Sequence, residues 1–286
     1  MNRTFVIAEA AGCHDGDLGK ALRLVDLARA IRADAVKFQW VSQAVRLCER
    51  RHAPEYLDAY RLLQFPHEWF SALVARCSAR APSSCCTDLI GTEEPSVEFM
   101  CTVFLPEDVP VIAPYVTRFK VSSFEAQDGE FIRAHLPYGK PIIGSLGAAD
   151  IQTQSGRLGY ALTRPGDAIL HCVAAYPVPW DEINLLAIRE IKNYSWTSAQ
   201  PLGGLSDHTT HPWTGALAVA AGADIIEFHL RLWDTWEGNA DYQVSRNPGE
   251  ALDYVANIRL AEAMLGDGVK RVQPCEEPML RYRVGG

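Results

Sequence analysis

The sequence lacks the features that would direct a protein into a membrane, out of the cell or onto nucleic acid. No apolar run approaches the roughly 20 residues needed to span a bilayer, and residues 1–9 have neither the apolar block nor the cleavage site of a signal peptide. The formal net charge is −8, without a basic run or a patch of arginines and aromatic residues. This balance argues against nucleic acid and anionic membranes as partners, so we expect a soluble cytoplasmic protein.

Paired cysteines and a glycine-rich nucleotide loop are also missing. The eight cysteines show no CxxC spacing, which gives no indication of a thiolate zinc site, and we expect most of them to be buried and reduced. No Gly-rich loop follows the first β-rich run. This weakens the alternative fold, an open doubly wound sheet.

The chain has the length and alternation of one α/β barrel. Its 286 residues are 48% hydrophobic, and about 250 residues are typical of a (β/α)8 domain. β-rich runs are predicted at 4–8, 33–39, 96–101, 117–121, 139–144, 167–172, 202–205 and 224–227. Helical patterns are predicted at 18–31, 54–63, 66–80, 131–135, 185–192, 213–223 and 248–265, and a short helical turn is predicted to start at 106–108. The expected fold is therefore a single (β/α)8 TIM barrel over residues 1–286, with 41–64 and 81–95 as irregular inserts and 271–286 as a tail.

Polar or chargeable residues follow nearly every predicted strand. They are Glu9, Lys37 with Gln39, Thr102, Lys120 with Ser123, Ser145, His171, His208 and His229. In a barrel these positions surround one pocket. Two lysines with hydroxyls and the amides near Gly147 suit a phosphate and a carboxylate. Glu9 is either an ion-pair partner of a lysine or a general base toward water.

His208 and His229 end two parallel strands joined by the helix at 213–223. Parallel strands open at the same rim, so the two imidazoles should be neighbours. Beside Asp207 and Glu227 they suit a divalent metal. The alternative for each histidine alone is a hydrogen bond that caps its strand.

Six segments together resemble the N-acetylneuraminate (sialic acid) synthases. They are residues 8–16 (AEAAGCHDG), 34–39 (DAVKFQ), 139–143 (GKPII), 170–172 with 176–179 (LHC and YPVP), 204–209 (GLSDHT) and 225–229 (IIEFH). The resemblance runs from about residue 4 to 284 in unbroken order. It implies a metal-dependent barrel that condenses phosphoenolpyruvate with an open-chain aldose or other aldehyde acceptor, giving a 2-keto-3-deoxy acid of the nonulosonate type and phosphate.

The same resemblance implies roles for individual residues. His208 and His229 fall at the ligands of a divalent metal, Mn²⁺ in the first place, with Mg²⁺ or Co²⁺ as alternatives. Glu9 matches the catalytic carboxylate. The positions that hold phosphoenolpyruvate are Lys37, Thr102, Lys120, Ser123, Ser145, Asn184 and Ser206. The positions near the sugar are Gln39, Glu125, Tyr176 and Asp241.

The chain also departs from the family pattern. Cys13 stands where the family has Asn, Val103 where it has Pro, and Leu146 where it has Thr. Cys13 is interpreted as a small buried substitution, with a reactive thiol as the alternative. The family's C-terminal antifreeze-like domain would begin about where this sequence stops, at residues 281–286. We therefore expect weak selectivity for an N-acetyl group, with Trp233, Trp236 and Tyr242 as candidates for closing the pocket.

Three hypotheses are compatible with the sequence. The first is the synthase, with N-acetylmannosamine or a non-standard acceptor, and with a homodimer possible. The second is a non-catalytic sugar- or metabolite-binding barrel, because Cys13, Val103 and Leu146 depart from the pattern. The third is a barrel aldolase with a lysine Schiff base, which is disfavoured because both lysines are assigned to anion binding.

Overall fold

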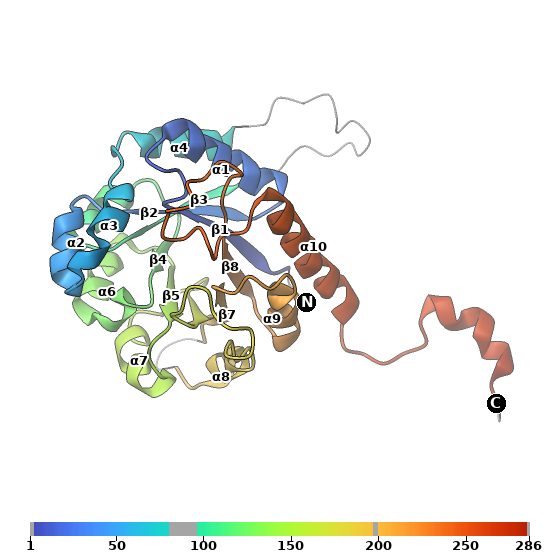
Figure 1. Cartoon of the computed structure of the whole chain (residues 1–286). Coiled ribbons are helices and arrows are strands. Elements are labelled where there is room, and N and C mark those ends of the chain that lie inside the picture. The colour runs from blue at the N-terminus through green and yellow to red at the C-terminus, as the bar shows by residue number, and fades with distance from the viewer. Residues whose placement is uncertain (1–2, 80–95, 197–199, 285–286) are drawn as a thin grey trace.

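Eight parallel strands close into one barrel (Figure 1). The computed structural model describes residues 3–79, 96–196 and 200–284, except for the side chains of residues 154–157. The strands are β1 (Phe5–Ala11), β2 (Ala35–Trp40), β3 (Glu98–Val103), β4 (Phe119–Val121), β5 (Ile142–Leu146), β6 (Ala168–Cys172), β7 (Leu202–Asp207) and β8 (Ile225–His229). β8 pairs with β1. This closure confirms the predicted TIM barrel and excludes the open doubly wound sheet.

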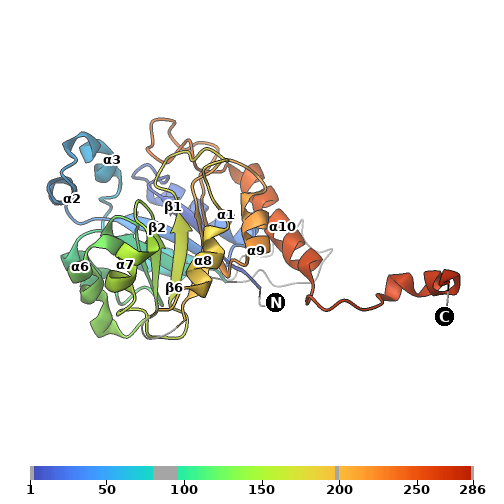
Figure 2. The ribbon, with the colours of Figure 1, turned by 90° about the horizontal axis from the view of Figure 1, so that it is seen from below.

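Helices form the outer layer of the barrel (Figures 1 and 2). The α-helices are α1 (Leu18–Ala30), α2 (Ala44–Arg51), α3 (Leu57–Leu62), α4 (Trp69–Ser78), α5 (Val109–Ile112), α6 (Gly129–His135), α7 (Ile151–Leu158), α8 (Ala187–Asn193), α9 (Thr214–Ala221) and α10 (Pro248–Leu265). The 3₁₀ turns are η1 (Pro54–Tyr56), η2 (Pro106–Asp108), η3 (Glu125–Gln127), η4 (Leu136–Tyr138) and η5 (Pro274–Tyr282). α10 has the predicted bounds because Asn247 and Glu250 form a capping box at its start.

Two helices, α2 and α7, fall outside the predicted set. The prediction of an irregular stretch over 41–64 was wrong for α2, which is amphipathic. Its buried residues are Ala44, Leu47 and Cys48, which is the 3–4 spacing of an amphipathic helix. The predicted insert at 81–95, with Cys85 and Cys86, lies outside the described residues.

Several strands continue one or more residues beyond their predicted ends. β1 continues through Glu9 to Ala11, β7 ends at Asp207 rather than 205, and β8 ends at His229 rather than 227. The polar residues at these positions therefore belong to the strands themselves. Successive side chains of a strand point to opposite faces, so this alternation decides which of them face the barrel interior.

The lower part of the barrel interior is apolar. Its buried cluster consists of Ile7, Ala35, Met100, Ile143, Ala168, Leu170 and Ile225, with Phe5 packed against it. Gly204 has to be small at this level, because a Cβ there would lie 2.1 Å from the Ile225 carbonyl oxygen. A separate, larger apolar core lies between strands and helices and includes Phe38, Phe119 and Tyr254.

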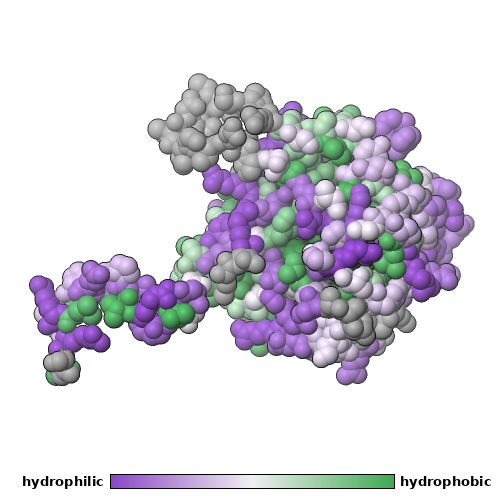
Figure 3. Space-filling view, turned by 180° about the vertical axis from the view of Figure 1, so that it is seen from behind, coloured by the Kyte–Doolittle hydropathy of each residue, from purple (hydrophilic) through white to green (hydrophobic). Residues whose placement is uncertain are grey.

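The C-terminal segment projects away from the barrel (Figures 1 and 2). After α10 the chain forms η5, none of whose residues is buried. Seen from behind, this segment carries apolar residues alongside polar ones (Figure 3). Within the described part of the chain, none of the helices combines the length and the apolar character that crossing a membrane requires.

Candidate active site

A polar layer lies directly above the apolar layer of the barrel interior. On most strands it is reached by moving two residues toward the carboxyl end, as from Ile7 to Glu9 or from Ile225 to Glu227. Its members are at most 4% exposed and are Glu9, Lys37, Thr102, Lys120, Ser145, Ser206 and Glu227. Neighbouring members face each other in register, for example Glu9 with Lys37 and Ser206 with Glu227. The structure thus brings six of the sequence-predicted residues together with Glu227.

Lys37 forms contacts across three strands. Its Nζ pairs with the Glu9 carboxylate, donates to Thr102 Oγ1 at 3.1 Å and lies 3.6 Å from Glu227 Oε2. Burial lowers the pKa of Lys37 to about 8, although the Glu227 carboxylate opposes this. Glu9 is held in turn by the Ala11 amide, which donates to its Oε1 at 2.7 Å. Both residues are therefore fixed in orientation.

Lys120 and Glu227 form the other half of the cluster. Lys120 Nζ donates to Ser145 Oγ at 2.8 Å and lies 3.3 Å from Glu227 Oε1, which also accepts from Ser206 Oγ at 2.9 Å. Burial alone would raise the pKa of Glu227, but the ammonium groups of Lys120 and Lys37 lower it to about 2. Glu227 is thus an ionised bridge between the two lysines.

The two rim histidines are neighbours, with ring centroids 5.3 Å apart. The Nδ1 of His208 lies 2.9 Å from the Val173 carbonyl oxygen. That contact assigns the proton to Nδ1 and leaves Nε2 as an acceptor. The Nδ1 of His229 is buried without a hydrogen-bond partner among the described residues and lies 3.8 Å from Asp241 Oδ1. Burial lowers the pKa of both rings, so both are neutral, as metal ligation requires.

The residues present fit a metal held by two imidazoles. An orphaned ring nitrogen and two neutral histidines at one rim are a suitable donor set for Mn²⁺ or a similar ion. Among the described residues, no cluster of three or more His, Cys, Asp or Glu side chains could hold a metal.

Asp207 does not belong to this site, although the sequence suggested it beside the metal. Its side chain points outward, where Arg246 Nη2 and the Tyr254 hydroxyl donate to Oδ2 at 2.9 and 2.6 Å. The Thr209 amide donates to its other oxygen at 2.8 Å. Asp207 therefore links β7 to α10 and has a structural role.

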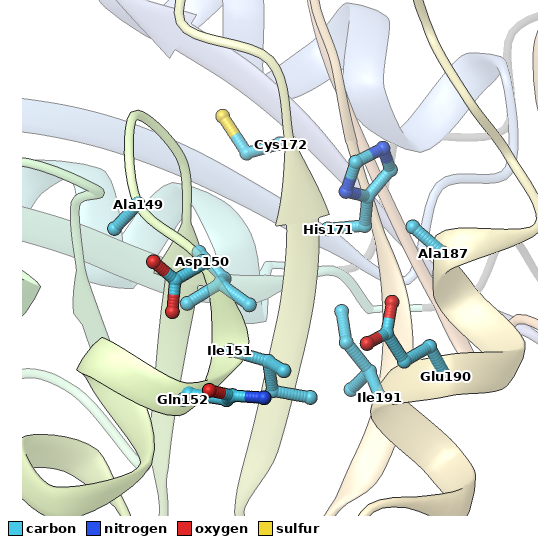
Figure 4. Close-up of a pocket in the computed structure, with 10 residues that line it drawn as sticks. Ala149, Asp150, Ile151, Gln152, His171, Cys172, Ala187, Glu190 and Ile191 are labelled. Carbon is cyan, nitrogen blue, oxygen red and sulfur yellow. The ribbon is translucent and has the colours of Figure 1, made fainter.

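His171 also faces away from the barrel interior, contrary to the prediction that it joins the pocket. It follows inward-facing Leu170, and its Nε2 lies 2.7 Å from the Ile183 carbonyl oxygen. His171 lines a separate cavity of about 420 Å³ whose wall includes Asp150, Ile151 and Glu190 (Figure 4). Alternation along β6 accounts for this position.

The residues predicted near the sugar are spread around the rim. The Tyr176 ring stacks on His208 at 4.1 Å and Asp241 faces His229, so these two border the histidine pair. Gln39 is half-buried next to Thr102 in register. Glu125 is buried in η3, where Arg51 pairs with it at 2.7 Å.

Two predicted phosphoenolpyruvate positions and Cys13 remain. Ser123 is buried, and a Cβ on Gly147 would lie 3.0 Å from its Cβ, so the backbones of the two loops approach closely. Asn184 is exposed in the β6–α8 loop with a left-handed φ of 46°. Cys13 is fully buried, 3.6 Å from Ser245 Oγ, and burial raises the pKa of its thiol. Cys13 is therefore the small buried residue that the sequence predicted.

Sequence reasoning missed two residues of this site. Glu227 was considered only beside the metal, although its position midway between inward-facing Ile225 and His229 is a signal that it faces the same interior. Arg51 was missed because no helix was predicted over 44–51. Within that helix it continues the buried spacing of Leu47 and Cys48, although its partner, 74 residues away, leaves no local pattern.

Comparison with known proteins agrees with this geometry. The sequence matches the NeuB family over residues 24–270. It is 28% identical to the N-acetylneuraminate-9-phosphate synthase of Homo sapiens, over 95% of this chain and 74% of that protein. It is also 28% identical to the N,N'-diacetyllegionaminic acid synthase of Campylobacter jejuni, over 97% of this chain and 82% of that protein. The crystal structure of a sialic acid synthetase from Leptospira borgpetersenii superposes with a TM-score of 0.82 at 27% identity, covering 99% of this chain and 92% of that one.

Proposed function

This chain belongs to the NeuB family, and on that premise we propose that its barrel condenses phosphoenolpyruvate with a sugar aldehyde to form a 2-keto-3-deoxy acid of the nonulosonic type. As a member of this family it is a phosphoenolpyruvate-dependent, carbon–carbon bond-forming synthase. The observation that supports the chemistry best is the buried layer in which Lys37 and Lys120 face one interior. Buried ion pairs are costly to maintain, so a buried cluster of two lysines and two carboxylates is a candidate functional site, where the lysines can contact an incoming anion.

The two lysines bind the phosphate and carboxylate of phosphoenolpyruvate. Thr102 and Ser145 accept hydrogen bonds from the lysines, so their own hydroxyl protons can be donated to the ligand. Ser206 donates to Glu227 and holds it in place. Charge-assisted contacts from buried cations are stronger than those in water because the surrounding dielectric is low. The enol carbon is thereby fixed with its reactive face toward the rim, where the acceptor arrives.

The reaction forms a C–C bond and a C–O bond to water, and it breaks the C–O bond to phosphate. C3 of phosphoenolpyruvate attacks the aldehyde carbon, the aldehyde oxygen takes up a proton, and positive charge develops at C2. Water adds to C2 and phosphate leaves by cleavage of the C2–O bond; of the two protons that water loses, one balances the proton on the new hydroxyl and the other leaves with the phosphate. Glu9 is oriented by the Ala11 amide and Lys37 and guides the water.

His208 and His229 would hold a divalent metal, Mn²⁺ first and Mg²⁺ or Co²⁺ as alternatives. The support is the pair of neutral imidazoles, one of them with an orphaned Nδ1. When bound, the metal supplies Lewis-acid polarisation of the aldehyde oxygen. Tyr176 and Asp241 border the same corner and contact the acceptor.

Phosphate release tests this proposal. The protein is incubated with phosphoenolpyruvate, Mn²⁺ and a panel of aldoses that includes N-acetylmannosamine, with EDTA and acceptor-free reactions as controls. We expect acceptor-dependent phosphate release and, from phosphoenolpyruvate labelled with ¹⁸O at the bridging oxygen, label in the phosphate. Absence of phosphate release with every acceptor would contradict the synthase and favour the non-catalytic binding barrel.

A further inference from the structure

The segment between β2 and α4 is docked onto the barrel by two adjacent arginines. They end α2, and each reaches an acidic residue that follows β4. Arg50 Nη2 donates to Asp128 Oδ2 at 2.6 Å, whereas Arg51 forms a fork on Glu125. The first pair is about one-third exposed and the second is buried on the Glu125 side, at 2% exposure. The two arginines therefore make contacts of very different strength.

The contact of Arg51 with Glu125 fixes both side chains. Nε donates to Oε1 at 2.9 Å, and Nη2 lies 2.7 Å from both Oε1 and Oε2. Ser122 Oγ also contacts Oε2. A carboxylate offers about four lone-pair positions, so these four contacts fill them. Glu125 is an anchored group, already satisfied before any sugar arrives.

Aromatic rings hold the guanidinium from its other sides. The Arg51 guanidinium carbon lies 4.8 Å from the centre of the Phe104 ring and 5.4 Å from that of Phe124. Nη1 donates to the Tyr60 hydroxyl at 3.2 Å. Burial by itself would lower the pKa of Arg51, but the Glu125 carboxylate raises it above its usual range. The planar guanidinium group of an arginine can contact all of these partners at once, whereas the ammonium group of a lysine cannot.

Arg51 lies close enough to Tyr176 for its charge to oppose the rise in the Tyr176 pKa that burial causes. Tyr176 stacks on His208, so the pair borders the corner of the rim where we propose that the acceptor binds. β4 carries Lys120, and the same strand continues through buried Ser123 to Glu125 in η3. Glu125 thus lies beyond Lys120 and Ser123 on this segment, in a turn that follows the strand. Moving Glu125 would shift the rim above Lys120 and leave the lysine itself in β4.

We infer that Arg51 is a positioning residue for the acceptor, which it serves by locking Glu125 and the loop after β4 in one orientation. The inference rests on the proposed function, because it concerns the second substrate of that reaction. It assigns a role to the charged segment 44–63, which would otherwise be a surface insertion. Arg51 acts through Glu125 and makes no contact with the reacting atoms.

The matched experiment compares Arg51→Met, Arg51→Lys and Arg50→Met with the wild-type enzyme. Arg51→Met should raise the KM for the acceptor about 10-fold or more, the usual effect of losing a charge-assisted contact, and the KM for phosphoenolpyruvate less than about 3-fold. Arg51→Lys restores the charge without the fork and should recover only part of the loss. Arg50→Met removes the same charge from the same helix and should change both constants by less than about 3-fold.

Each result counts for or against the inference. Equal changes in both KM values for Arg51→Met, or full recovery by Arg51→Lys, would overturn it. If Arg51→Met does not fold, Glu125→Gln and Arg51→Lys provide the same split between the two substrates. A wild-type protein without phosphate release would refute the proposed function and this inference with it. Wild-type turnover with an unchanged acceptor KM in the variants refutes the inference alone.

Discussion

The two layers inside the barrel are built by the same strands and are equally buried, yet they differ in chemistry. The lower layer is aliphatic apart from Met100 and Phe5. Two residues further along, the upper layer carries two carboxylates and two ammonium groups in contact with one another. Burial therefore does not distinguish core from site in this barrel; the distinction is the level along the strand.

The cost of the two layers explains the difference. Burying aliphatic groups stabilises a fold by about 25 cal/mol per Å², whereas buried ion pairs often contribute less than apolar residues of the same size. The upper layer balances its charge, since Glu9 and Glu227 match Lys37 and Lys120. A balanced but expensive arrangement is expected where an incoming anion makes use of the cations.

The largest expected effect lies at the rim, above both layers. His229→Ala or His208→Ala should abolish binding of the proposed divalent metal and lower kcat by about 1,000-fold, because a Lewis acid at this position would supply several kcal/mol of transition-state stabilisation. The barrel should stay folded, since neither ring belongs to an apolar core cluster. Metal analysis of the purified variants checks this, with His171→Ala as the control outside the barrel. Undiminished manganese in both rim variants would place the ligands elsewhere.

A substitution in the lower layer should lower the stability of the fold and leave substrate binding almost unchanged. Met100→Ala removes a fully buried side chain and should reduce the free energy of unfolding by about 2–5 kcal/mol. The KM for phosphoenolpyruvate should change little below the unfolding transition. Urea unfolding of Met100→Ala and of Thr102→Ala, two residues further along β3, compares the layers directly. A larger stability loss at Thr102 than at Met100 would break the distinction between the layers.

Replacing a lysine of the upper layer should change binding more than folding. Lys120→Met should raise the KM for phosphoenolpyruvate about 10- to 100-fold, since a contact to a charged group is worth about 1.5–3 kcal/mol. The KM for the acceptor should rise far less. Steady-state kinetics with each substrate varied in turn measures the split. Equal effects on the two substrates would argue that Lys120 only holds the fold through Ser145 and Glu227.

Periodicity in the sequence was sufficient for the barrel and for most of the upper layer. Long amphipathic patterns such as α1 and α10 were predicted to within a residue or two, and polar strand ends identified Glu9, Lys37 and Lys120 as a group. The direction in which each strand residue faces, into or out of the barrel, was predicted less well. His171 was assigned inward because it ends a strand, although counting by two from Leu170 places it outside.

Contacts between distant segments could not be predicted in the same way. The Arg51–Glu125 fork joins residues 74 positions apart, and Asp207 finds Arg246 and Tyr254 on the outer side of β7. Neither pairing leaves a local pattern, because each depends on how helices and loops dock after the barrel closes. The sequence thus predicted the residues of the barrel interior better than the long-range contacts that hold the surrounding helices and loops in place.

The smallest expected effect is a pH dependence that belongs to the upper layer alone. Burial lowers the pKa of Lys37 to about 8, and kcat/KM reports ionisations of the free enzyme. Above that pH the ammonium loses its proton, so kcat/KM for phosphoenolpyruvate should fall about tenfold for each further pH unit. This alkaline fall in kcat/KM should persist in Lys120→Met and should be absent in Lys37→Met.

A measurement of folding stability distinguishes this fall in kcat/KM from alkaline unfolding. As Lys37 loses its proton, kcat/KM should fall, whereas the contribution of Lys37 to stability should rise. The ordinary pKa of lysine is 10.5, above the folded value of about 8, so between these values the unfolded chain binds more protons than the folded one. The contribution of Lys37 to stability therefore rises with pH over that window while its ability to bind an anion falls. Urea unfolding and kcat/KM, measured on one sample series from pH 7 to 10, should thus diverge. A parallel loss of both would mean that Lys37 supports the fold in its charged form, and the upper layer would then differ from the lower one only in polarity.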